Sequence, residues 1–177
     1  MSLSRIVFYT RNLSKEQDGS HADVIKGILQ SCRQHDNASG ITGALIFDRR
    51  YILQAMEGDR TLLSSRIRNL SADERHGGLT LMSFGSIDVR EFTGWTVGYA
   101  GHEETTDRLY MLYGSLPEFD PTRMSEVSAL HLLREFSCLE SKFVQRSAPL
   151  VNRTAAVALD GIPSRFRMAH GPVRGLG

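Results

Sequence analysis

The chain has 177 residues, of which 41% are hydrophobic and 23% are charged, and its formal net charge is +1. This length predicts one domain with room for a short appendage, and the composition is typical of a globular protein. A net charge this small gives no reason to expect nucleic acid as a partner of the whole chain. The sequence holds no apolar run of about 18 residues, so we expect no helix that spans a membrane.

The cysteines and histidines exclude two further classes of protein. Cys32 and Cys138 are isolated and far apart, so they do not form the framework of a disulfide-rich secreted domain. The N-terminal residues show no cleavable signal layout, and the expected location is therefore the reducing cytoplasm. The six histidines do not combine with cysteine or carboxylate at metal-ligand spacing, and we expect no metal site.

Residues 4–10 predict the first strand, because their side chains alternate between two faces. Ile6 and Phe8 point one way, and Val7 and Tyr9 point the other. A polar loop that ends in glycine follows this strand.

A helix and a hairpin come next. Ser20 and Asp23 predict a capping box for a helix over about residues 20–35, whose apolar residues recur at helical spacing. Two apolar runs, 41–48 and 51–56, are separated by two arginines and predict a β-hairpin.

The next segment predicts a second helix and two more strands. Asp59 can cap the helix, and its buried stripe consists of Leu63, Ile67 and Leu70. A glycine pair then breaks the chain before a strand over residues 79–87, and a short strand over 95–100 follows.

This order of elements predicts an α+β fold with a ferredoxin-like βαββαβ core and one extra strand. In such a fold two helices cover one face of the sheet. The other face would expose a large apolar patch unless the C-terminal part of the chain covered it. We therefore expect the C-terminal helices to lie on this second face.

Two helices are expected in the C-terminal part. Residues 109–116 predict a short one, and Asp120 with Pro121 marks the start of a longer one. The apolar stripe of the longer helix is Met124, Val127, Leu130 and Leu133.

The last part of the chain lacks periodicity. Residues 148–177 contain four Arg, one Asp and several Pro and Gly, which is typical of a flexible tail. We therefore divide the chain into a core over 1–101, a helical cap over 102–145 and a flexible tail over 146–177.

Several stretches of the core resemble the BLUF family of flavin-based blue-light sensors. They are a tyrosine on the first strand, Tyr9, then GITG at 40–43 and ILQAMEG at 52–58. The sequence DERH at 73–76 and a Phe–Trp pair that ends at Trp95 add to the match. The resemblance covers about residues 1–100, and it is carried by the order and spacing of the fragments.

The resemblance implies non-covalent binding of FAD, with the flavin ring between the two helices of the core. Gln54 would be hydrogen-bonded between Tyr9 and the flavin, and the phenol would donate an electron and a proton to the excited flavin. The amide carries both donors and acceptors, so it can change the group that it presents. Further cofactor contacts implied by the resemblance are Ile28, Cys32, Asp36, Asn37, Ile52, Asn69, Leu70 and Asp73. Trp95 and Val97 would couple the switch to the fifth strand.

Three positions depart from the pattern of the family. Asp36 stands where the family has the asparagine that anchors the ring, although Asn37 follows directly. A carboxylate only accepts hydrogen bonds, so it would repel the flavin C4 carbonyl, and a buried mismatch of this kind costs about 1–3 kcal/mol. Asn69 replaces an arginine, and Val97 replaces a methionine.

Two functions follow as expectations. The first is a blue-light photoreceptor that signals to a partner protein through its C-terminal helices or within a homo-oligomer. The alternative is a degenerate member of the family that serves as a protein-interaction module with weak or no flavin binding. We expect no enzyme, because no arrangement of nucleophile, base or paired carboxylates has suitable spacing. The expected strands also lack the aromatic pattern on which RNA-binding sheets stack bases.

Overall fold

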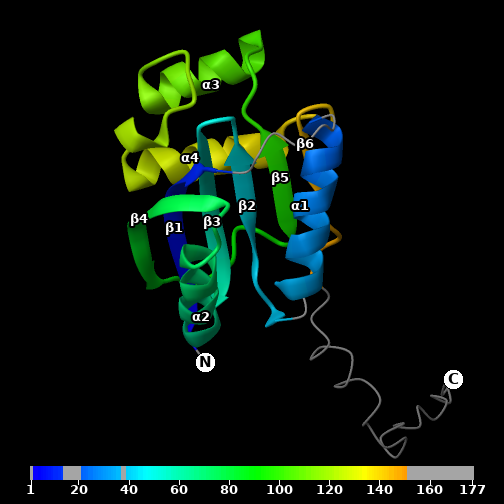
Figure 1. The fold of residues 1–177 in the computed structure, drawn as a ribbon, viewed down its shortest axis with the longest axis vertical. Helices are drawn as coiled ribbons and strands as arrows, with labels where there is room; N and C mark the ends of the chain where they lie inside the picture. Colours follow the sequence, from blue (N-terminus) through cyan, green and yellow to red (C-terminus); the bar gives the residue numbers. More distant parts are fainter. Residues whose placement is uncertain (1, 14–20, 37–38, 151–177) are drawn as a thin grey trace, which may run out of the picture.

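Six strands form one sheet in the order β4-β1-β3-β2-β5-β6 (Figure 1). The computed structural model describes residues 2–13, 21–36 and 39–150. The elements follow one another as β1 (Leu3–Asn12), α1 (His21–His35), β2 (Thr42–Phe47), β3 (Tyr51–Asp59), α2 (Arg60–Ser71), β4 (His76–Ser86), β5 (Trp95–Tyr99), α3 (Glu104–Gly114), a 3₁₀ turn (Pro121–Arg123), α4 (Glu126–Cys138) and β6 (Val144–Arg146).

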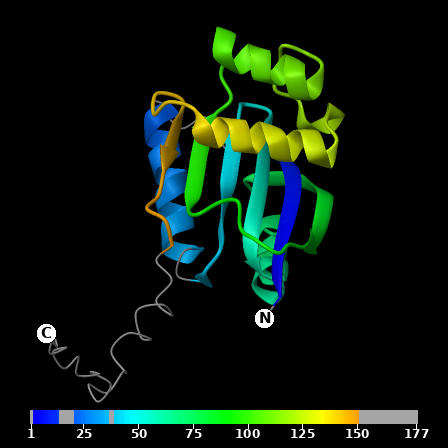
Figure 2. The same ribbon diagram turned by 180° about the vertical axis from the view of Figure 1, so that it is seen from behind.

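The layers agree with the predicted α+β fold. Helices α1 and α2 lie on one face of the sheet, with β2 and β3 between them in the view of Figure 1. From behind, α4 crosses the strands on the other face and α3 lies beyond their ends (Figure 2). Among the helices in the described part of the chain, none is long and apolar enough to cross a membrane.

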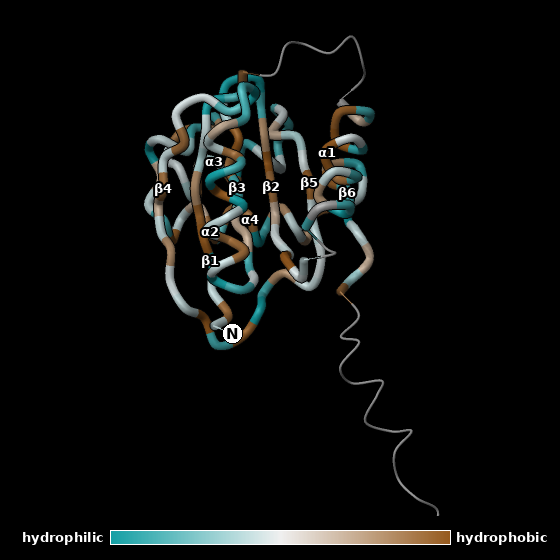
Figure 3. The backbone as a smooth tube through the Cα atoms, turned by 60° about the horizontal axis from the view of Figure 1, so that its bottom comes forward, coloured by the Kyte–Doolittle hydropathy of each residue, from teal (hydrophilic) through white to brown (hydrophobic). Residues whose placement is uncertain are grey.

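The sheet separates two apolar cores, because successive side chains of a strand point to opposite faces. The tube in Figure 3 shows long apolar stretches along the central strands. The core on the face of α1 and α2, called the helix-pair core below, contains Ile6, Phe8, Ile25, Leu29, Cys32, Ile41, Leu45, Phe47, Ile52, Met56, Leu63, Leu70, Trp95 and Val97. The core under the C-terminal helices, called the cap core, includes Val7, Ala44, Ile46, Leu53, Ala55, Tyr110, Leu132, Leu133 and Phe136.

The cap that was predicted for α2 is confirmed, whereas the start of the long C-terminal helix was predicted too early. The Asp59 carboxylate accepts hydrogen bonds from the second and third backbone N–H groups beyond it, at 2.9 and 3.3 Å. Asp120 caps only a 3₁₀ turn, and α4 begins after Ser125, whose hydroxyl accepts from Ser128 N. This shifts the buried stripe, so that Val127 is 59% exposed.

The sixth strand was not predicted. Val144–Arg146 pairs antiparallel with β5, inside the region expected to be helical cap and at the start of the expected tail. The chain continues along β5, where Ser147 N donates to Trp95 O at 2.7 Å and Leu150 N donates to Thr93 O at 2.8 Å. The rest of the expected tail, residues 151–177, lies outside the described residues.

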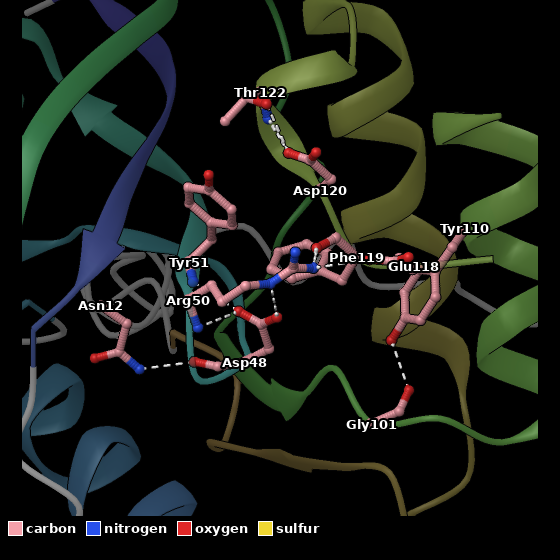
Figure 4. Close-up of polar contacts among 10 residues, drawn as sticks. All are labelled: Asn12, Asp48, Arg50, Tyr51, Gly101, Tyr110, Glu118, Phe119, Asp120 and Thr122. Carbon is pink, nitrogen blue, oxygen red and sulfur yellow. Dashed lines mark hydrogen bonds and ion pairs between the residues drawn. The ribbon is translucent and has the colours of Figure 1, made fainter. Parts of the chain in front are cut away.

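Polar contacts tie the β2–β3 hairpin to the C-terminal cap (Figure 4). The Asp48 carboxylate accepts from the backbone of Arg50 at 2.8 Å and of Tyr51 at 2.6 Å, which closes the turn. The guanidinium of Arg50 then donates to Phe119 O at 3.0 Å. The turn therefore positions both the hairpin and the segment between α3 and α4.

At Gly43, strand β2 packs so closely against β3 that there is no space for a side chain. A Cβ atom there would lie 2.1 Å from the carbonyl oxygen of Ala55, a backbone atom that has no room to move. We expect Gly43→Ala to lower the free energy of unfolding by about 2 kcal/mol or more, measured by urea denaturation. Gly85→Ala on the edge strand β4 is the matched control, because nothing lies within 4 Å of its added Cβ. Equal stability of the two variants would contradict this account.

Candidate functional site

Gln54 is a polar side chain in the middle of an apolar face. It lies on β3 between Ile52 and Met56, which belong to the helix-pair core, and it is 2% exposed. Its partners in register on the neighbouring strands are Phe8 on β1 and Leu45 on β2. Hydrocarbon side chains therefore flank the amide on both sides.

No hydrogen bond links the Gln54 amide to another residue that the structure describes, although its nitrogen and oxygen are not among the fully enclosed atoms that lack a partner. A buried amide without a partner costs about 1–3 kcal/mol of stability, and most buried polar side chains in proteins are paired. A ligand that supplied a carbonyl or an N–H group at this position would remove the cost. Gln54 is therefore a candidate ligand contact on the face of α1 and α2.

Tyr9 does not lie beside Gln54. On β1 it pairs with Leu53, it contacts the cap core, and its ring meets that of Tyr51 edge-on at 6.3 Å between centroids. It is therefore on the opposite face of the sheet, and the expected Tyr9–Gln54 pair is corrected. The reason is the two-residue period of the strand, which brings Phe8 to the helix-pair core.

Asp36 and Arg66 connect the end of α1 to α2. Asp36 is 1% exposed, and its carboxylate accepts a hydrogen bond from Arg66 Nη2 at 3.3 Å. Arg66 Nε lies 2.9 Å from the other carboxylate oxygen, but its N–H bond is not directed at that atom. Among the described residues, Nε is the only fully enclosed side-chain nitrogen or oxygen that lacks a hydrogen bond.

The other expected contacts on α1 and on β3 are apolar and lie on the same face. Cys32 and Ile52 are buried in the helix-pair core, and Ile28 is partly buried and packs against it. Burial, reinforced by the nearby Asp36 carboxylate, raises the pKa of the Cys32 thiol to about 12. The thiol is therefore protonated near neutral pH and behaves as a small hydrophobic group.

Of the cofactor contacts expected at the end of α2, one is buried in the helix-pair core and another is exposed. Leu70 is buried in the helix-pair core, whereas Asn69 is exposed on the helix surface. The carboxylate of Asp73 is bound by Arg75, whose hydrogen bonds hold the pKa of Asp73 well below its usual range. Asn37 lies outside the described residues.

Trp95 and Val97 lie on the same face as Gln54. Val97 pairs with Leu45, which pairs in turn with Gln54, so the three residues form one row across β5, β2 and β3. The indole nitrogen of Trp95 donates to Ile41 O at 3.2 Å. Trp95 is therefore a core residue whose polar group is satisfied.

Two residues of the site were missed in the sequence. Phe8 was assigned to a face but not to the site, since both faces of a central strand are buried and alternation alone does not identify the partner. Arg66 had a usable signal, because it lies three residues after Leu63 and four before Leu70 on the buried stripe of α2.

A comparison with solved structures shows the same fold in BLUF proteins. The photo-activated state of BlsA is 20% identical with a TM-score of 0.64, and the match covers 78% of this chain and 96% of that chain. The dark state of BlrB, a BLUF protein, is 21% identical with a TM-score of 0.56, and the match covers 76% of this chain and 93% of that one. Identities this low show similarity of fold alone.

No curated protein matches the chain. A family model for BLUF, described as sensors of blue-light using FAD, matches residues 3–98. Because the match spans more than half of the 177 residues, the chain belongs to the BLUF family.

Proposed function

We propose that this chain binds a flavin non-covalently on the face of α1 and α2, with Gln54 as a direct hydrogen-bonding partner of the ring. The observation that carries the proposal is the buried Gln54 amide, which lacks a partner among the described residues. The apolar residues that flank it suit the faces of a planar ring, and the amide suits a polar edge. FAD is the flavin named in the description of the family.

We further propose that the flavin-bound chain acts as an interaction module without the phenol-dependent light switch. The switch requires a hydroxyl beside Gln54 that can give up a proton, and Phe8 carries none. Tyr99 shares the helix-pair face, but it lies two strands from β3 and contacts Phe47 at 5.5 Å between ring centroids. In this function, a partner protein would be bound through the C-terminal helices.

The proposal is tested first by absorption spectroscopy of the purified protein after reconstitution with FAD. We expect a bound flavin spectrum that does not undergo a reversible red shift in blue light. A protein that took up no flavin would overturn the binding proposal. A reversible red shift in the wild type would instead overturn the absence of the switch, and Tyr99→Phe would then test that phenol as its source.

Phe8→Tyr is expected to introduce the missing switch. The substitution adds a hydroxyl on the strand position that pairs with Gln54, so light-minus-dark spectra of the flavin-bound variant should show a red shift that the wild type lacks. Tyr9→Phe is the matched control, because it removes a phenol from the other face and should leave the spectra unchanged. If the wild type did show a light response and Tyr9→Phe abolished it, the assignment of Tyr9 to the opposite face would be contradicted.

Gln54→Leu is expected to raise the stability of the flavin-free protein and to lower its affinity for FAD. Without flavin, the variant should be more stable than the wild type by about 1 kcal/mol, because an unpaired amide is replaced by an apolar group of similar size. Its affinity for FAD, measured by quenching of flavin fluorescence, should fall at least about tenfold. Gln30→Leu on the exposed side of α1 should change neither quantity. A destabilised Gln54→Leu variant would mean that the amide is satisfied within the protein.

A further inference from the structure

A groove of about 570 Å³ lies between α1 and β6, at the end of the sheet opposite to β4. Helix α1 packs beside β5 and β6, and both ribbon views place it next to β6 (Figures 1 and 2). A volume of this size is typical of a binding site. The groove is lined by residues of one stripe of α1 and by one residue of β6, namely Lys26, Leu29, Gln30, Arg33, Gln34 and Gln145.

The lining of the groove is positively charged. It contains two cations, Lys26 and Arg33, and no carboxylate. Arg33 forms no ion pair with a residue that the structure describes. Lys26 lies 3.9 Å from the Asp23 carboxylate, but both side chains are exposed, and an exposed pair of this kind is weak. Both cations are therefore available to an anionic ligand.

The other polar groups of the groove are the carboxamides of Gln30, Gln34 and Gln145. Gln145 pairs with Val97, which belongs to the helix-pair core, so the Gln145 side chain is on the face that α1 covers. A carboxamide both donates and accepts hydrogen bonds, as a peptide group does. These three groups therefore suit a ligand that carries peptide groups in addition to its negative charge.

The backbone of β6 offers further hydrogen-bonding groups beside the groove. Strand β6 is the last of the sheet, so no described strand lies beyond it. Ser147 N donates to Trp95 O at 2.7 Å, and the alternation of an antiparallel ladder then directs the backbone of Gln145 to β5. The same alternation directs the N–H and C=O groups of Val144 and Arg146 to the outer edge. An open edge of this kind accepts an extended peptide as an additional strand.

We propose that the groove between α1 and β6 binds an extended, acidic segment of a partner protein. The segment adds to the outer edge of β6, and its carboxylates pair with Lys26 and Arg33. These cations are seven residues apart on α1, which is about 10 Å along the helix axis. Acidic residues two or four apart on a strand share a face and are separated by about 7 or 13 Å, so each reaches one cation. The groove is three strands away from Gln54, and the proposal does not depend on flavin binding.

Two synthetic peptides, VEVTVEV and its uncharged analogue VQVTVQV, test the recognition of charge. In fluorescence anisotropy titrations at low ionic strength, the wild type should bind the acidic peptide about fivefold more tightly or better. The double variant Lys26→Gln with Arg33→Gln should bind the two peptides equally. Arg68→Gln with Arg123→Gln is the matched control, because it removes the same charge from exposed positions outside the groove and should keep the wild-type preference.

Backbone methylation of the acidic peptide tests the addition of a strand. Successive N–H groups of a strand point to opposite sides, so methylation of the third and fourth nitrogens blocks the one that faces β6. We expect the affinity to fall about tenfold or more, although the charge is unchanged. An analogue that bound as tightly as its parent would show recognition of charge alone and would overturn the proposal. A wild type that did not prefer the acidic peptide, or a preference that persisted in Lys26→Gln with Arg33→Gln, would overturn it as well.

Discussion

The register between β1 and β3 determines which aromatic side chain accompanies Gln54. Phe8 pairs with Gln54 and Tyr9 with Leu53, so the benzene ring lies on the face of α1 and α2 while the phenol lies under the C-terminal helices. A shift by one residue would exchange the two faces along all of β1. It would also break the contact of Arg5 with Glu57, at 2.8 Å from Nε, and would bring a guanidinium into the helix-pair core. The position of Tyr9 away from Gln54 is therefore a consequence of the whole sheet.

The strand that carries Gln54 on one face carries a buried charge on the other. Glu57 is fully enclosed, and its carboxylate accepts hydrogen bonds from Arg5 and from the backbone of Glu91 and Phe92. The Glu91 side chain is bound in turn by Arg5 and by Arg134 of α4. A buried carboxylate is tolerated only with such compensation, and removing one partner of a buried pair commonly costs about 3–5 kcal/mol. Because these bonds join β3, the segment before β5 and α4, the C-terminal cap is attached to the strand that carries Gln54.

Periodicity in the sequence predicted five strands, the two helices of the core and the side of the sheet that each helix covers. It did not predict β6, because three residues are too few to show alternation. It placed Val127 in the wrong stripe, since the phase of α4 depends on where the helix begins, and Ser125 rather than Asp120 provides that cap. The sequence also did not predict that Arg66 is the partner of Asp36, because an ion pair between separate helical segments depends on their packing and not on spacing along the chain.

The groups around Gln54 suit hydrogen bonding to a bound ring better than transfer of a proton to it. The Gln54 amide forms no hydrogen bond with the described residues, and a ring edge with a carbonyl or an N–H group would supply one. Proton exchange needs, in addition, a titratable group next to the amide. Phe8 has none, and the indole N–H of Trp95 already donates to Ile41 O. The described groups around Gln54 thus suit the edge of a bound ring, and the strand position that pairs with the amide holds a phenylalanine, which has no hydroxyl.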